Sequence, residues 1–466
     1  MNPLSIFDIF KIGVGPSSSH TLGPWRAALH FVETLEGRNI KSLKVQLFGS
    51  LSKTGKGHAT DKAVLLGLQG YDPITMDTDQ IDNIIADISV RKELSIHGRN
   101  VSFDPEIDLI FEEYEHIKHP NTVKFTARTT EGLHQEEDYM SVGGGFIELG
   151  TTLETKVRKT LPFPINKGAD LVQHTQNDTL HISEIVAKNE LVFRNEEAIE
   201  QQTEAIIEIM LESVFLGCTN TGVLPGGLNV QRRANKIINT LTGKSTFANK
   251  EELFDTIKSL TQDFVTINKV ISCFAIAVNE QNASLSRVVT SPTNGAAGVI
   301  PAAMLYFMLF CDYKDKTDLK RFLYTAGEIG CLFKKNATIS AAVGGCQAEI
   351  GVSSSMAAAA LTELKGGTAL QCLMAAEIAM EHHLGLTCDP IGGLVQAPCI
   401  ERNAMGVIKA ITAANLAMMS NADEAIVKLD EVIETMWQTA QDMDKKYKET
   451  SEGGLAKYSS PRFPNC

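Results

Sequence analysis

The 466-residue chain is too long for one ordinary hydrophobic core, so two or three domains are the starting expectation. Its 43 basic and 56 acidic side chains give a net charge of −13 without a basic stripe, which argues against nucleic acid or a membrane surface as the main partner. Nine cysteines without an N-terminal secretory signal predict reduced thiols and a cytoplasmic location. The longest apolar run, residues 296–311, is too short to span a bilayer and contains Pro301, which predicts a buried helix.

Residues 1–155 show the mixed pattern of an α/β domain. Serine caps and an early proline predict a helix within residues 17–32, and a second helix is expected to begin at Thr60. Lys44–Gly49 is expected to be a strand. Three further stretches alternate between apolar and polar residues as strands do: 107–111, 122–128 and 139–149.

Residues 156–180 form a polar stretch broken by Pro162 and Pro164, which we interpret as a linker with room for short ordered pieces. Nearly every segment of residues 181–466 has helical character and is rich in Ala, Gly and Met, which is typical of helices buried on several sides. The predicted fold class is therefore α+β, with a small N-terminal α/β domain joined to a large all-helical domain.

Residues 388–399, C-D-P-I-G-G-L-V-Q-A-P-C, carry two cysteines on a stretch whose glycines and prolines predict an irregular loop. A third loop cysteine, Cys346, lies upstream in V-G-G-C. Zinc remains an alternative, but these separations lack the close pairs of zinc sites. Three thiolates suit a [4Fe–4S] cluster with one open iron, which is a Lewis acid. The competing interpretation, a buried structural thiol, is preferred for Cys218, Cys273, Cys311, Cys331 and Cys372.

Two N-terminal turns carry candidate proton-transfer groups. In P-S-S-S-H-T, three serines before a helix offer donors for a carboxylate or phosphate, and His20 stands at their edge. In G-K-G-H, Lys56 and His58 follow a glycine turn. Histidine is the usual proton carrier near neutral pH, although a structural role for each is an open alternative. The Walker A pattern of a nucleotide-binding loop is missing.

The turn S-P-T-N-G-A-A-G, residues 291–298, presents Thr293 and Asn294 at the start of the apolar helix. Their short polar groups suit either substrate contact or helix capping, and both interpretations remain open.

Five longer motifs together cover both halves of the chain: G-P-S-S-S-H-T-L-G-P, G-K-G-H-A-T-D, S-P-T-N-G-A-A-G-V-I-P-A, V-G-G-C-Q-A-E-I-G and C-D-P-I-G-G-L-V-Q-A-P-C-I-E-R-N. They resemble the bacterial iron–sulfur L-serine dehydratases in their single-chain form. The resemblance implies conversion of L-serine to pyruvate and ammonia by a [4Fe–4S] cluster without pyridoxal phosphate. It also implies a small α/β domain joined to a large helical one, and we expect a homodimer.

The resemblance implies a role for each matching position. Cys346, Cys388 and Cys399 match the cluster ligands, and His20 and His58 match the catalytic histidines. We expect His58 to be the base and His20 its polarising or acid partner, although the two could be exchanged. The candidate substrate-binding residues are Ser17, Ser18, Ser19, Lys56, Thr293 and Asn294.

The last residue, Cys466, carries a thiol and a free carboxylate, so we expect the tail to place it on the open iron as a resting-state fourth ligand. Four alternatives to a cluster-dependent serine dehydratase remain: a pyridoxal-phosphate enzyme for the same reaction, an L-cysteine desulfidase, another cluster hydro-lyase and a ligand-sensing N-terminal module.

Overall fold

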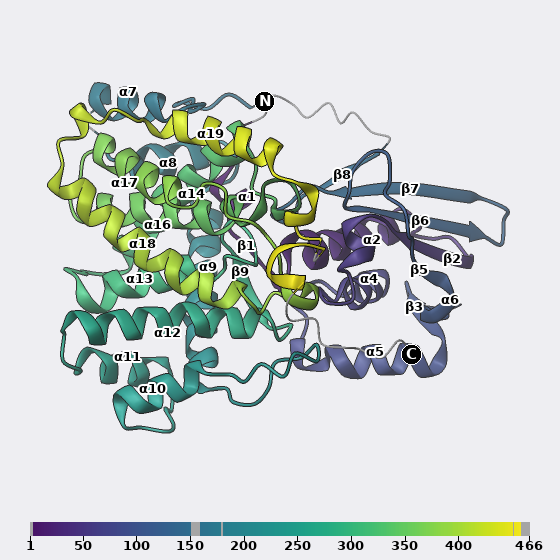
Figure 1. The fold of residues 1–466 in the computed structure, drawn as a ribbon. Coiled ribbons are helices and arrows are strands. Elements are labelled where there is room, and N and C mark those ends of the chain that lie inside the picture. The colour runs from purple at the N-terminus through teal and green to yellow at the C-terminus, as the bar shows by residue number, and fades with distance from the viewer. Residues whose placement is uncertain (1–2, 151–158, 179, 451, 458–466) are drawn as a thin grey trace.

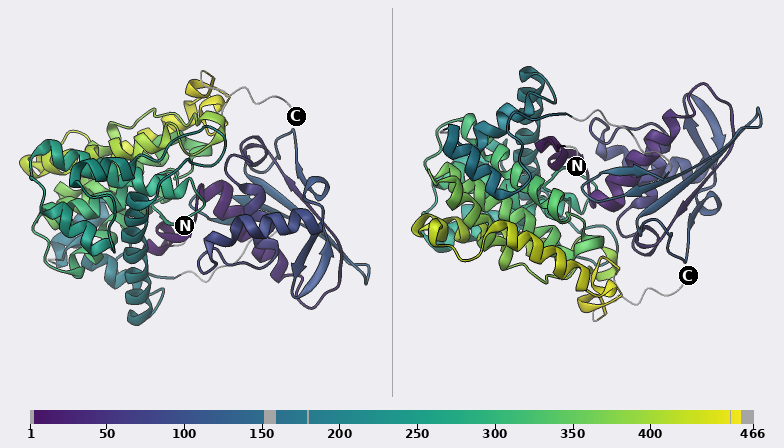
Figure 2. Two further views of the ribbon diagram at one scale, coloured as in Figure 1. Left: turned by 90° about the horizontal axis from the view of Figure 1, so that it is seen from below. Right: turned by 90° about the horizontal axis from the view of Figure 1, so that it is seen from above.

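The computed structural model describes residues 3–150, 159–178, 180–450 and 452–457. The chain forms a sheet-containing unit and a larger helical unit that lie side by side (Figures 1 and 2). This confirms the predicted α+β fold class.

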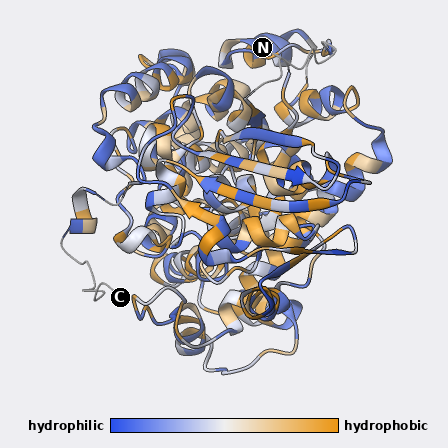
Figure 3. Ribbon diagram, turned by 90° about the vertical axis from the view of Figure 1, so that its right-hand side faces the viewer, coloured by the Kyte–Doolittle hydropathy of each residue, from blue (hydrophilic) through white to orange (hydrophobic). Residues whose placement is uncertain are grey.

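A five-stranded sheet of order β5-β2-β6-β7-β8 is the frame of the smaller unit. Its strands are β2 (Ile40–Leu47), β5 (Leu109–Phe111), β6 (Thr122–Thr129), β7 (His134–Ser141) and β8 (Ile147–Leu149). Strand β5 runs parallel to β2, and the other pairs are antiparallel. Hydrophilic and hydrophobic residues alternate along the strands (Figure 3), as expected where one face is covered and the other is exposed.

Helices α2 (Gly23–Glu33) and α4 (Thr60–Leu68) cover one face of this sheet. Phe31 of α2 stacks on Phe125 of β6 with 5.0 Å between ring centroids, and both side chains are fully buried. The remaining elements of this unit are α3 (Ser50–Lys53), α5 (Ile81–Arg91), β3 (Glu93–Ile96), β4 (Arg99–Ser102) and α6 (Pro105–Asp108). The packing of α2 and α4 matters for the site because each of these helices begins just after one of the two candidate histidines.

The first elements of the chain pack into the helical unit. Helix α1 (Ile6–Ile9) buries its apolar side chains in the large helical core, and β1 (Lys11–Val14) pairs antiparallel with β9 (Arg287–Thr290). The capping serine Ser5 donates to the buried Glu190 carboxylate at 2.7 Å. The N-terminal segment therefore crosses from one unit to the other before the sheet begins.

Helix α16 (Ile350–Leu364) lies at the centre of the helical unit, and its small alanine and serine side chains allow close approach from several sides. The other helices of this unit are α7 (Gly168–Asp178), α8 (Ile182–Glu190), α9 (Glu196–Thr219), α10 (Ala234–Thr242), α11 (Lys250–Lys258), α12 (Phe264–Asn282), α13 (Val299–Phe310), α14 (Lys316–Asn336), α15 (Ala341–Gly344), α17 (Ala369–Glu381), α18 (Cys399–Met419) and α19 (Leu429–Asp442). Helix α7 falls within the stretch expected to be a linker. Among the described helices, none is long and apolar enough to cross a membrane.

Glycine contacts bring the two units together near the candidate site. A Cβ atom on Gly57 would lie 2.8 Å from the carbonyl oxygen of Gly393, so the turn before His58 touches the cysteine loop directly. On the other side, Lys11 donates to the carbonyl of Gly144 at 2.9 Å in the β7–β8 loop. The histidine turns are therefore held against the cysteine-bearing part of the helical unit.

Candidate functional site

His20 lies on a π-helical turn, Ser18–Leu22, that leads into α2. The side chain of Ser17 caps this turn by accepting from the His20 N–H at 3.1 Å. The two histidine turns are also tied to each other, because the Thr21 hydroxyl donates to the His58 carbonyl at 2.7 Å and the Thr60 hydroxyl to the His20 carbonyl at 2.6 Å. The serine and threonine residues of the two motifs thus fix the backbone that presents both imidazoles.

Hydrogen bonds define the proton positions on His58. Its Nδ1 lies 3.0 Å from the Thr54 carbonyl oxygen, which can only accept, so Nδ1 carries the proton in the neutral ring. Its Nε2 is buried and has no hydrogen-bond partner among the described residues. The neutral ring of His58 therefore keeps a free basic lone pair on Nε2.

His20 is instead bonded through both ring nitrogens. Its Nε2 lies 2.9 Å from the Ser50 hydroxyl, which itself donates to the Glu449 carbonyl at 3.1 Å. Ser50 has only one hydroxyl proton, so His20 Nε2 must donate and Nδ1 must accept from Ser19 at 2.9 Å. His20 has no free lone pair in this arrangement.

The two imidazoles stack with 4.5 Å between ring centroids and are essentially inaccessible to solvent, at 0% and 1% exposure. Burial lowers the pKa of His58 to about 4, and burial together with the neighbouring His58 lowers the pKa of His20 well below its usual value. Both rings are therefore neutral at physiological pH.

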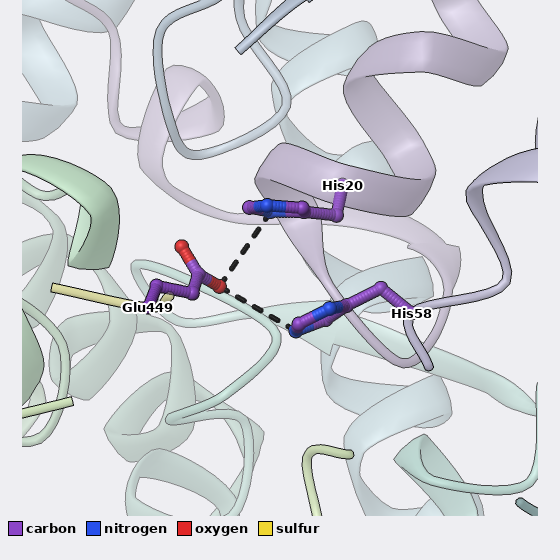
Figure 4. A group of neighbouring side chains, drawn as sticks. All are labelled: His20, His58 and Glu449. Atoms are coloured by element: carbon purple, nitrogen blue, oxygen red, sulfur yellow. Dashed lines mark ion pairs between the residues drawn. The ribbon is translucent and has the colours of Figure 1, made fainter. Parts of the chain in front are cut away.

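Glu449 is the third member of this group, and the sequence motifs gave no indication of it. Its Oε1 lies 3.6 Å from His20 Nδ1 and 3.5 Å from His58 Nε2 (Figure 4), and its Oε2 is buried without a partner among the described residues. Burial, followed by the charges of Glu349 and Cys346, raises the pKa of Glu449 well above its usual value.

The segment that carries Glu449 is fastened to the cysteine loop. The Cys388 N–H donates to the Tyr447 carbonyl at 2.7 Å, and the Glu449 N–H donates to the Cys388 carbonyl at 2.9 Å. Glu449 has a φ of +57°, an unusual conformation for a residue with a side chain. Through these bonds one residue joins the histidine pair to the thiol region.

Three elements supply the thiols of Cys346, Cys388 and Cys399. The first lies in a 3₁₀ turn (Gly345–Ala348), the second is extended, and the third is the first residue of α18 rather than part of the expected irregular loop. All three are at most 7% exposed, and the Cys346 and Cys388 sulfurs lie within 4.8 Å of one another and of a Glu349 carboxylate oxygen.

Arg402, one turn into α18, binds this thiol region. Its guanidinium donates to Cys346 Sγ at 3.2 Å and to the Thr387 carbonyl at 2.7 Å, and it pairs with Asp389 at 3.0 Å. Burial lowers the pKa of Arg402 and the three thiols raise it, with a net upward shift. A buried set of thiols beside a guanidinium group is compatible with a metal cofactor.

The candidate substrate-binding residues differ in their surroundings. Ser17 and Ser19 are linked hydroxyl to hydroxyl at 3.2 Å beside His20, and Ser18 is buried in the same turn. The Thr293 hydroxyl is buried and has no partner among the described residues. Asn294 is used internally, because its amide donates to Asn282 at 3.0 Å and its oxygen accepts from Thr290 at 3.4 Å.

Lys56 does not join this group in the structure. Its side chain is exposed and lies over the ring of Phe111, 5.6 Å from the centroid. Cys466 lies outside the described residues.

Comparisons with known proteins agree with this architecture. A family model described as serine dehydratase beta chain matches residues 5–151, and one described as serine dehydratase alpha chain matches residues 177–456. L-serine dehydratase 2 of Escherichia coli (strain K12) is 42% identical over 461 residues, which cover 97% of this chain and 98% of the relative. The L-serine dehydratases of Streptomyces coelicolor and Helicobacter pylori are 43% and 42% identical, over 97% and 98% of this chain and 98% and 99% of theirs.

Fold and site together define an enzyme whose sheet unit carries a buried histidine pair and whose helical unit carries three buried thiols. The chain belongs to the serine dehydratase family, with the beta-chain and alpha-chain parts fused in one polypeptide. This confirms the resemblance seen in the motifs.

Proposed function

We propose that the enzyme dehydrates L-serine and releases pyruvate and ammonia. The observation that carries this proposal is the free lone pair of His58 Nε2, buried beside Glu449, whose backbone is bonded to the cysteine loop. A neutral imidazole with a free nitrogen is suited to abstract a proton from carbon, and the thiol region next to it is suited to hold a Lewis acid. Relatives of similar length carry the name L-serine dehydratase.

Cys346, Cys388 and Cys399 would hold a [4Fe–4S] cluster. When bound, such a cluster supplies one open iron that polarises the hydroxyl and carboxylate of the substrate. Arg402 donates a 3.2 Å hydrogen bond to Cys346 Sγ, and Asp389 holds the guanidinium in place. The proposal requires no pyridoxal phosphate.

His58 acts as the base in this proposal. Its Nδ1–H is held by the Thr54 carbonyl, which orients Nε2 toward the substrate and offsets part of the charge that develops when Nε2 takes the α-proton. The hydroxyl groups of the turn Ser17–Ser19, which His20 anchors through Ser19, orient the substrate carboxylate, and Thr293 offers a further hydroxyl. His58 takes the α-proton, the bond from the β-carbon to its hydroxyl oxygen breaks, and the leaving hydroxide takes up the proton from His58 to give water and 2-aminoacrylate. The 2-aminoacrylate tautomerises and hydrolyses to pyruvate and ammonia without further help from the protein.

One anaerobic experiment tests this function. Purified protein should be brown, should contain iron and sulfide, and should form pyruvate from L-serine. Pyruvate and sulfide from L-cysteine in preference to L-serine would identify an L-cysteine desulfidase, and 2-oxobutyrate from L-threonine measures the breadth of specificity. A yellow protein inactivated by borohydride would contradict the proposal in favour of a pyridoxal-phosphate enzyme.

Cys466 is the proposed fourth ligand of the resting cluster. Support comes from the sequence, because the thiol and terminal carboxylate of Cys466 present the same spacing of groups as the hydroxyl and carboxylate of serine. The Cys466→Ser variant and a one-residue truncation should lose oxygen protection and any lag before full activity. Unchanged oxygen sensitivity and activation kinetics in both would refute the role.

A cytoplasmic homodimer is part of the same proposal. The free thiols support a reducing compartment. The outer face of α18 exposes Met405, Leu416 and Met419 at 59%, 42% and 77%, a row of apolar side chains suited to a second copy. Sedimentation of the wild-type protein and of a Met405→Lys/Met419→Lys variant tests the assembly.

A further inference from the structure

Glu449 is a buried carboxyl group without a cationic partner. Among the described residues, no lysine or arginine nitrogen lies within 4.0 Å of its oxygens, and its only ion-pair contacts are the imidazoles of His20 and His58. Its side chain is 6% exposed, and Oε2 has no hydrogen-bond donor in the described structure. Buried carboxylates are normally paired or multiply hydrogen-bonded, so this one has capacity for a ligand.

The histidines do not supply the missing positive charge. His58 Nδ1 is the protonated nitrogen, and its Nε2, which faces Glu449, is the free base. His20 uses its one proton on Ser50 and accepts from Ser19 at Nδ1, the nitrogen that faces Glu449. Neither imidazole can therefore donate a proton to the carboxylate: His58 directs a free lone pair toward it, and His20 presents a nitrogen that carries no proton.

The backbone holds Glu449 in this position at some conformational cost. A positive φ costs a residue with a side chain on the order of 1 kcal/mol, and it persists only where surrounding contacts enforce it. Here the contacts are the bond from the Glu449 N–H to Cys388 and the bond from Ser50 to the Glu449 carbonyl. Both are anchored to residues that flank the proposed reaction site.

We propose that Glu449 binds the α-ammonium group of the substrate, and this inference rests on the proposed serine dehydration. An ammonium group brings three N–H donors and the positive charge that the carboxylate lacks. Its nitrogen is bonded to the same carbon that loses a proton. Since Glu449 Oε1 lies 3.5 Å from His58 Nε2, an ammonium group on Glu449 places the α-carbon beside the base.

This arrangement makes Glu449 a specificity-determining residue. It selects 2-amino acids over 2-hydroxy acids of the same shape, because a hydroxyl in place of the ammonium group leaves the carboxylate without its charge partner. The two compounds that isolate this contact are L-serine and L-glycerate, which differ only in the group on the α-carbon.

The test uses anaerobically purified holoenzyme and the Glu449→Gln variant, which keeps the shape of the side chain and removes its charge. We expect the KM for L-serine to rise about 10- to 100-fold, the value of a charge-assisted hydrogen bond, with a smaller fall in kcat. The inhibition constant of L-glycerate should change less than about twofold, because that ligand never uses the charge. Glu449→Asp should restore part of the affinity for L-serine.

Glu452→Gln is the matched control. Glu452 follows on the same segment, is exposed, and pairs with Lys53 at 3.0 Å. The KM of the Glu452→Gln variant for L-serine should therefore equal that of wild type. Equal losses for L-serine and L-glycerate in Glu449→Gln, or a fall in kcat at unchanged KM, would overturn the inference. If the Glu449→Gln variant does not retain iron, the KM for L-serine and the inhibition constant of L-glycerate are compared in Glu449→Asp instead. Failure of the proposed function is a separate result, namely no pyruvate from the wild-type enzyme.

Discussion

His20 is hydrogen-bonded through both ring nitrogens, whereas His58, stacked on it at 4.5 Å, is bonded through Nδ1 alone. From the sequence, either ring could be the base. The structure supports His58, because removing a proton requires a nitrogen with an available lone pair. His20 is better suited to orient the substrate and the serine turn.

His58→Ala should reduce kcat about 10²- to 10⁴-fold, because the proposed general base is removed. The visible absorbance and iron content should match those of the wild-type protein, since His58 is not one of the proposed cluster ligands. His382→Ala is the control, because His382 lies at the exposed end of α17 and its side chain is 60% accessible. Wild-type turnover by the His58 variant would exclude His58 as the base.

Acidification should destabilise the wild-type protein relative to His58→Gln. Burial lowers the pKa of His58 to about 4 from an ordinary value of 6.5, so between these pH values the unfolded chain binds a proton that the folded chain does not. Stability is therefore lost as pH falls through this window, by about 2 kcal/mol for His58 between pH 7 and pH 5. Urea unfolding of both proteins at the two pH values measures the difference. An identical pH dependence in both would show that His58 is not buried as a neutral ring.

Single replacement of Cys346, Cys388 or Cys399 by Ser should abolish the brown chromophore and lower the iron content, because a hydroxyl replaces a thiolate ligand. Circular dichroism should remain that of a folded helical protein. Cys311→Ser is the control, since Cys311 lies at the end of α13 in the helical core and should keep its iron. Full iron content in all three variants would show that these thiols are structural and do not bind the cluster.

Arg402→Met should destabilise the protein by about 3 kcal/mol, because Asp389 would remain buried without its cation. Cluster loss in air should also accelerate, since the hydrogen bond to Cys346 disappears. Arg233→Met is the comparison, because Arg233 pairs with Glu401 at a more exposed position. Equal melting temperatures for the two variants would contradict the buried role of Arg402.

Much of the site could be predicted from sequence because its residues lie in motifs with local turn chemistry. Serine caps and glycines mark the Ser17–His20 turn and the turn that contains His58. Each of these turns leads into a helix, α2 or α4, and the two helices lie side by side. Lys56 belongs to the same motif as His58, but its side chain lies over Phe111 and away from the histidine pair. The direction of a side chain in a turn depends on long-range contacts, which a short sequence motif does not specify.

Glu449 could not be predicted in this way. It lies in D-K-K-Y-K-E-T, a charged stretch that is typical of a solvated surface. Its burial depends on pairing between residues 447–449 and Cys388, about sixty positions away in the sequence. The packing of α1 and β1 into the helical unit could not be predicted from the sequence for the same reason. Strands β1 and β9 have four residues each, and their pairing is entirely long-range.

The β1–β9 pair also bears on how the two parts of this family stay together. The beta-chain match begins at residue 5 and so includes α1 and β1, which the structure places inside the helical unit. A polypeptide cut between residues 151 and 177 would still be held by a strand and a helix that the N-terminal fragment inserts into the C-terminal one. Covalent fusion is therefore not what fastens the two parts, and co-expressed fragments should assemble as a stable complex.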